Sequence, residues 1–181
     1  MLPFTASSFY ASRMDSRPID VFAEAIWHNA ATPRCKHFLW LTHHDRLPST
    51  ALLHRRSIID SSACAYCGSY EDQHHILLQC PRTRRLWRLI GWDCAPHLTS
   101  FRDLWLMPQL PDSNARIRSA IVTSLLWNIW KCRNNLQFNG VLTPPQMVLR
   151  AASEDLKMWR HRLPHSVCPD SLMRIADSFV I

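Results

Sequence analysis

The sequence predicts a mainly α protein. Only three of the 181 residues are glycine, so multi-hairpin β folds and glycine-rich phosphate loops lack the turns they need. Apolar side chains recur at helical spacing along two long stretches, residues 113–139 and 144–161. A short run of cysteine and histidine lies between residues 64 and 80. We therefore expect a small helical domain that a metal ion bound at that run cross-links, followed by a long antiparallel helical hairpin.

The chain before the cysteine run predicts three helices. The first spans residues 4–13 and the second residues 20–28. We expect the inner side of the second helix to carry four apolar side chains, Phe22, Ala25, Ile26 and Trp27. The third begins near Arg34, is centred on the apolar run 38–41, and ends before Pro48, because a residue that precedes proline disfavours helical backbone.

Two short helices flank the cysteine run. Ser49 caps the first, and Pro81 begins the second at a position where its missing N–H costs nothing. Gly91 closes the second helix, and a short helix at residues 101–107 follows.

Arginines face solvent in the two helices that flank the cysteine run. They are Arg55 and Arg56 in the first helix and Arg84, Arg85 and Arg88 in the second. A basic stripe is therefore expected beside the cysteine run, with a merely solvated helix face as the alternative.

The apolar pattern over residues 113–139 predicts the longest helix, which we expect to end at Gly140. The apolar face of this helix is so wide that we expect burial on two sides; it comprises Ile117, Ile121, Val122, Leu125, Leu126, Ile129, Trp130, Cys132 and Leu136. Thr143 caps the last long helix, which Pro144 starts and which ends near His161.

Three segments follow from these elements. We assign residues 1–107 to a metal-binding domain, residues 108–163 to a helical hairpin region and residues 164–181 to a C-terminal tail. The tail is ambiguous, with a short amphipathic turn around Leu172 and Phe179 as one option.

The cysteine run has the spacing of a closed zinc site. Cys64 and Cys67 are separated by two residues, so both thiolates of a tight turn can reach one Zn²⁺, and His75 and Cys80 are separated by four residues. Gly68 follows the second cysteine, where such a turn needs a positive φ. We expect one structural zinc ion with these three thiolates and one imidazole as ligands.

Some alternatives remain at this stage. His74 is the rival ligand, one residue out of register, and ordinary buried thiols are the alternative to a metal site. The remaining cysteines have no partner at metal spacing and are expected as core or surface thiols: Cys35, Cys94, Cys132 and Cys168. A site with four protein ligands leaves no position for water or substrate, and the acidic residues form no catalytically spaced cluster, so we predict no enzyme.

The composition indicates which partners to expect. A net charge of +7 and a pI near 9.4 favour polyanions, RNA or DNA bound with low specificity. An odd number of cysteines, seven, argues against a disulfide framework and for a reducing intracellular compartment, nucleus or cytoplasm.

The longest apolar run, around residues 120–130, is interrupted by polar side chains, so no membrane span is expected. Most tryptophans recur within apolar stripes and are expected in the core.

Several short motifs resemble a known family. They are residues 38–41, 46–50, 64–68, 75–81 and 85–87. Together they resemble the zinc-binding domain downstream of the reverse transcriptase in plant LINE-type, non-LTR retrotransposons. Residues 126–140 look like the helical segment that joins that domain to a ribonuclease H domain, so the resemblance covers roughly residues 4–160. It implies a nucleic-acid-associated zinc module with the four ligands named above, and no polymerisation, because the catalytic aspartates belong to other parts of such polyproteins.

Three hypotheses about function follow. The first is a non-catalytic zinc module that contacts nucleic-acid phosphates through its arginines. The second is a protein-interaction module that uses exposed parts of the hairpin at residues 113–161. The third is an inert retroelement remnant.

Overall fold

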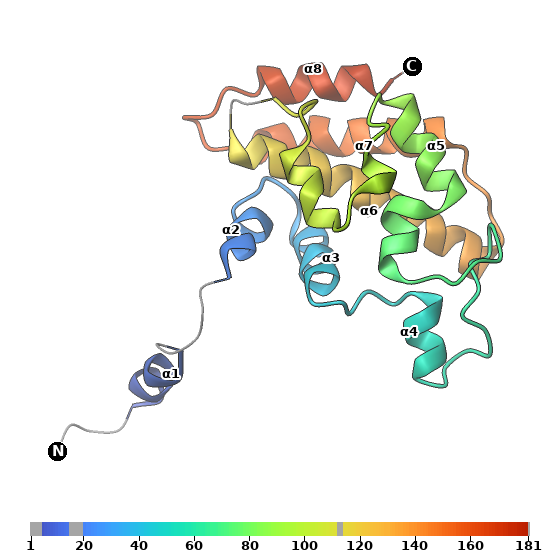
Figure 1. Ribbon diagram of the computed structural model, residues 1–181. Helices are drawn as coiled ribbons and strands as arrows, with labels where there is room; N and C mark the ends of the chain where they lie inside the picture. The colour runs from blue at the N-terminus through green and yellow to red at the C-terminus, as the bar shows by residue number, and fades with distance from the viewer. Residues whose placement is uncertain (1–4, 15–19, 112–113, 181) are drawn as a thin grey trace.

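The computed structural model describes residues 5–14, 20–111 and 114–180, and over these residues the predicted mainly α fold is confirmed. The described residues form only an isolated β-bridge in place of a sheet. A long helix, α6 (Ala115–Asn139), runs through the middle of the molecule with α7 (Pro145–Trp159) packed along it (Figure 1). The predicted hairpin of two long helices is therefore present.

Three helices open the described chain: α1 (Ala6–Met14), α2 (Val21–Trp27) and α3 (Pro33–His43). All three are predicted elements, although the predicted start of the first at residue 4 lies outside the described residues. Asp20 caps α2 because its carboxylate accepts a hydrogen bond from the N–H of Phe22 at 3.1 Å.

The sequence prediction for the inner face of α2 is wrong at Trp27. Trp27 is 45% exposed, whereas its neighbour Ile26 is fully buried. Successive residues of a helix are about 100° apart around its axis, so the buried direction of Ile26 turns Trp27 outward. The Trp27 ring instead packs on the ring of Trp40 in α3, with centroids 5.8 Å apart.

Short helices lie within and around the cysteine run: α4 (Thr50–Arg55), the π-helix η1 (His75–Gln79), α5 (Pro81–Leu89), and the 3₁₀ helices η2 (Ala95–His97) and η3 (Phe101–Leu106). Ser49 caps α4 as predicted, because its hydroxyl accepts a hydrogen bond from the N–H of Leu52 at 3.2 Å. Pro81 begins α5, and Gly91 follows its end with a φ of 72°, also as predicted. The predicted helix at residues 101–107 is the 3₁₀ helix η3.

The ends of the hairpin differ from the sequence prediction at one point. Asn114 caps α6, and Gly140 ends it in the left-handed region with a φ of 67°, as predicted. Thr143 is not the cap of α7, and Pro144 is not its first residue: the helix begins at Pro145 and Pro144 precedes it with a ψ of 148°. The reason is steric, since a residue before proline avoids helical backbone and Pro144 is followed by Pro145.

The C-terminal residues form more structure than the sequence indicates. A 3₁₀ turn, η4 (Arg160–Arg162), extends α7, and the ambiguous region contains a full helix, α8 (Asp170–Ser178). Leu172 and Ala176 of α8 are fully buried, and Phe179 just beyond it is buried as well. These side chains hold α8 against α7 and α6.

One hydrophobic cluster extends from Ile26 in α2 to Phe179 after α8. Helix α6 is central to it, because α6 contacts α2, α3, η1, η3, α7 and α8. Its predicted stripe is buried on several sides, and only Leu136 of that stripe is half-buried. None of the helices in the described ranges has both the length and the apolar content to cross a membrane.

Candidate metal centre

The first two candidate ligands lie on a tight backbone turn, the cysteine knuckle (residues 64–69). The N–H of Gly68 donates to the carbonyl of Cys64 at 2.9 Å, and the N–H of Cys64 donates to the carbonyl of Ser69 at 2.8 Å. Gly68 has a φ of 74°, the left-handed conformation that the sequence predicts for it and that a side chain would strain. The β-bridge between Ala63 and Tyr70 closes the base of the turn.

The other two candidate ligands are brought together by η1. In this π-helix the N–H of Cys80 donates to the carbonyl of His75, five residues earlier, at 2.7 Å. The wider turn, closed by this bond, brings the first residue of η1 and the residue after its end to the same side of the segment. Asp72 fixes the start of η1, since its carboxylate accepts a hydrogen bond from the N–H of His75 at 2.7 Å.

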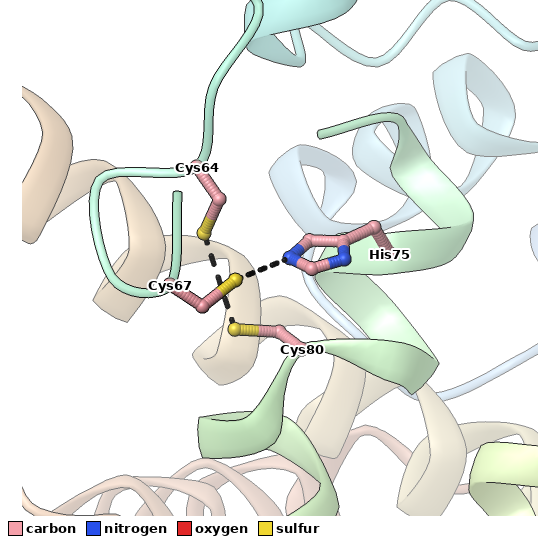
Figure 2. A group of neighbouring side chains, drawn as sticks. All are labelled: Cys64, Cys67, His75 and Cys80. Carbon is pink, nitrogen blue, oxygen red and sulfur yellow. Dashed lines mark hydrogen bonds between the residues drawn. The ribbon is translucent and has the colours of Figure 1, made fainter. Parts of the chain in front are cut away.

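The four side chains converge on one point (Figure 2). Their ligand atoms all lie within 4.8 Å of one another. Cys64 Sγ lies 4.0 Å from Cys80 Sγ, and Cys67 Sγ lies 3.4 Å from His75 Nε2. In tetrahedral zinc sites, Zn–S bonds of about 2.3 Å place two sulfur ligands about 3.8 Å apart. The donor set and its spacing therefore fit one zinc ion.

The electrostatics of the two facing thiols also favour a cation. A hydrogen bond with Cys80 lowers the pKa of Cys64, although burial acts in the opposite direction. The same hydrogen bond, with burial, raises the pKa of Cys80. The two sulfur atoms, 4.0 Å apart, thus compete for one proton. A zinc ion supplies two positive charges at that position and can hold both cysteines as thiolates.

The structure separates the two rival histidines. His75 is buried and its Nε2 belongs to the cluster. His74 is half-buried and lies outside the cluster, lining a hollow together with Arg55 and Arg102. His75 is thus the histidine that the geometry brings to the three cysteines.

A buried ion pair links the metal loop (residues 64–80) to the hairpin of α6 and α7. Glu71, between the cysteine knuckle and η1, is 1% exposed. Arg133 of α6 donates from Nε to Glu71 Oε1 at 3.0 Å, and the N–H of Thr50 donates to the same oxygen at 3.1 Å. Arg133 also donates to the carbonyl of Pro48 at 3.3 Å. One carboxylate therefore joins the loop, α4 and α6.

The sequence alone does not reveal this ion pair, because its partners are 62 residues apart. One signal was available: Arg133 lies four residues after Ile129 and three after Trp130, on the buried stripe of α6. A charged residue at such a position needs a buried partner.

Arg82 is a second neighbour of the centre that the sequence did not indicate. It is half-buried in α5 and lines a cavity of about 30 Å³ with Cys64, Cys80 and Glu71. Burial lowers the pKa of Arg82, while the nearby Cys80, Tyr66 and Cys64 raise it. A guanidinium at this place offsets the negative charge of three thiolates.

Asp20, His43 and His44 form another group of neighbouring side chains in the described residues. His43 Nε2 lies 2.6 Å from the Asp20 carboxylate, and Arg102 donates from Nε to His43 Nδ1 at 3.0 Å. Both ring nitrogens of His43 are therefore engaged. Asp20, His43 and Arg102 therefore form a hydrogen-bonded chain that ties α2, α3 and η3 together, and the ring of His44 packs against that of His43.

The five candidate phosphate contacts are exposed, as the sequence predicts. Arg84, Arg85 and Arg88 lie on the outer face of α5, and Arg55 and Arg56 lie at the end of α4. The structure places Arg84 beside the metal centre, in a hollow that it lines with His75 and Gln79.

Comparison with known proteins supports the metal centre. A family model described as zinc-binding in reverse transcriptase matches residues 4–87, a segment that contains all four clustered ligands. No curated protein and no solved structure matches the chain. The matched segment ends within α5, before the hairpin. Residues 4–87 are thus similar to the zinc-binding domain of reverse transcriptases, and the structure shows a Cys₃His cluster within that segment.

Proposed function

We propose that the protein is a non-catalytic zinc module that binds RNA or DNA through phosphate contacts. Its centre holds one structural zinc ion, with Cys64, Cys67, His75 and Cys80 as ligands. The observation that carries the proposal is the closed donor set with an unpaired arginine face beside it. Four protein ligands complete a tetrahedral site, so the ion stabilises the fold and leaves no position for a catalytic water.

The arginines of α5 support the nucleic-acid part of the proposal. Arg84, Arg85 and Arg88 are exposed and form no ion pair with any carboxylate of the described residues. By contrast, Lys157 pairs with Asp177 at 2.8 Å elsewhere on the surface. The charge on α5 is therefore available for phosphates. Arg55 and Arg56 at the end of α4 are exposed as well and form no ion pair with any carboxylate of the described residues.

The test is a salt titration of binding to RNA and DNA oligonucleotides. Each phosphate contact contributes about 0.7 to 0.9 to the slope of log K against log salt. Replacing Arg84, Arg85 and Arg88 by alanine should weaken binding and reduce the slope by about two to three. A matched variant with alanine at Arg13, Arg160 and Arg174 loses the same charge from exposed positions on other elements. An unchanged slope in the α5 variant, or an equal loss in the matched variant, overturns the assignment.

We further propose a retroelement origin, of the plant LINE type that the sequence motifs resemble, and an intracellular, reducing environment. The match of residues 4–87 to zinc-binding in reverse transcriptase supports the origin. The environment is consistent with the seven cysteines, all of which are free thiols in the structure.

A second function has one observation in its favour. Four apolar side chains are exposed where α6 meets α7, a surface termed here the hairpin tip: Phe138, Val141, Leu142 and Met147. Such a patch suits a protein partner. Binding to a protein that is lost on replacing Phe138 and Leu142 by serine, without any salt-sensitive binding of nucleic acid, would favour this function over the first.

A further inference from the structure

We infer that the nucleic acid this module takes is single-stranded, and that Tyr70 is the ring on which an unpaired base stacks. This inference rests on the proposed function, because it concerns the same surface. It goes further by naming the class of strand and a contact that is not electrostatic.

The backbone holds the Tyr70 ring outward. Tyr70 lies in the β-bridge with Ala63, and the N–H of Glu71 donates to the carbonyl of Ser62 at 2.9 Å. Successive side chains of extended backbone point to opposite sides. Since Glu71 is fixed inward by Arg133, Tyr70 must face solvent, and it is 65% exposed. The ring is thus presented on a backbone that the metal loop and a buried ion pair both fix.

Two hollows meet at this ring. One, of about 480 Å³, is lined by Tyr70 together with His75, Gln79 and Arg84. The other, of about 390 Å³, is lined by Tyr70 together with Arg55, His74 and Arg102. Tyr70 therefore stands between an arginine of α5 on one side and arginines of α4 and η3 on the other.

Acidic groups in the hollows are engaged in local hydrogen bonds. Asp72 lines both hollows and accepts from the N–H of His75, and Asp45 accepts from the Gln73 side chain. These bonds satisfy part of each carboxylate, and the arginines border the hollows on both sides. A strand can therefore place phosphates at the arginines and a base at the ring.

This arrangement selects unpaired bases. In a duplex the faces of the bases are covered by their neighbours, whereas a single strand can splay one base out onto an aromatic ring. Base–aromatic stacking does not depend on sequence, because every base has a π-face. The expected preference is therefore for single strands without strong sequence specificity.

The experiment compares Tyr70→Ala, Tyr70→Phe and the control Tyr10→Ala, which removes an exposed ring from α1. Fluorescence anisotropy measures the binding of a labelled oligouridine, an oligothymidine and a duplex of the same length. We expect Tyr70→Ala to weaken single-strand binding about 5- to 150-fold. The salt slope should stay unchanged, because no charge is lost. Tyr70→Phe and Tyr10→Ala should bind like the unmodified protein.

The outcomes separate this inference from the proposed function. If the triple arginine variant loses binding while Tyr70→Ala does not, the stacking role is overturned and the phosphate contacts stand. Equal affinity for duplex and single strand overturns the strand preference in the same way. If no variant alters binding, both proposals fail. Zinc content and thermal unfolding of each variant show whether the fold is retained.

Discussion

The four clustered side chains make the metal centre a site where single substitutions have sharp effects. Each supplies one of four donors that lie within 4.8 Å of one another, and no fifth histidine, cysteine or carboxylate of the described residues belongs to the group. His74, the nearest rival in sequence, lies outside the cluster. The remaining cysteines are elsewhere in the fold. The centre should therefore depend on each ligand individually.

Cys80→Ser tests this dependence. We expect protein purified without added metal to contain about one zinc ion per chain, and Cys80→Ser to lose it, because a hydroxyl is a far poorer zinc ligand than a thiolate. Elemental analysis measures the content. Cys168→Ser, at an exposed cysteine outside the cluster, should keep its zinc. Zinc retained at the unmodified level in Cys80→Ser would contradict the assigned ligands.

Acid should release the metal. Zinc binds deprotonated cysteine and neutral histidine, so protons compete with the metal for its ligand atoms and affinity falls as pH falls. We expect zinc to be retained at about pH 7 and lost after dialysis at about pH 4, with structure around the metal loop lost in parallel. Elemental analysis and circular dichroism follow the two events. Metal retained at the lower pH would exclude a site built from thiolates and imidazole.

Arg133→Met should destabilise the protein strongly, because it leaves the buried Glu71 carboxylate without its charge partner. Removing one partner of a buried pair typically lowers the free energy of unfolding by about 3–5 kcal/mol. Urea unfolding measures the change. The double variant Glu71→Leu/Arg133→Met should recover much of the loss, since no charge is then left uncompensated. A double variant as unstable as the single one would show that the pair acts in another way.

Among the elements, α8 shows how tertiary packing decides what the local sequence leaves open. Its apolar residues are few, yet Leu172 and Ala176 are fully buried against the hairpin. An isolated helix of this length is marginal in water, so its stability comes from that packing.

Replacing Leu172 by alanine should therefore lower the free energy of unfolding by about 2–5 kcal/mol, the usual cost of a buried leucine. Arg174→Ala, on the exposed side of α8, should be nearly neutral. Urea unfolding of both variants checks the difference. A neutral Leu172→Ala would mean that α8 is not packed as the structure shows.

Much of the fold could be predicted from local sequence signals. Features that depend on contacts between residues far apart in the sequence could not. The spacing of Cys64 and Cys67, and the caps at Ser49 and Gly140, are short-range patterns that the structure reproduces. Helix α7 begins one residue later than the local pattern predicts, because Pro145 keeps Pro144 out of helical backbone. The π-turn at His75 depends on packing and could not be predicted from a helical period.

In the whole molecule, α6 is the element on which the others depend. It contacts helices from the N-terminal, metal-binding and C-terminal parts of the chain, and all of them contribute to one hydrophobic cluster. The metal loop is attached to this body by the ion pair between Glu71 and Arg133. Order at the centre and order in the hairpin should therefore be coupled.

That ion pair also bears on how such a module could be inherited. Residues 4–87 carry every clustered ligand, so a rearranged gene that kept only this stretch would transmit a complete donor set. It would not transmit Arg133, and the Glu71 carboxylate would lie against the loop with no cation opposite it. The stretch that recombination can move without loss of stability must therefore extend at least through α6, well beyond the boundary of sequence similarity.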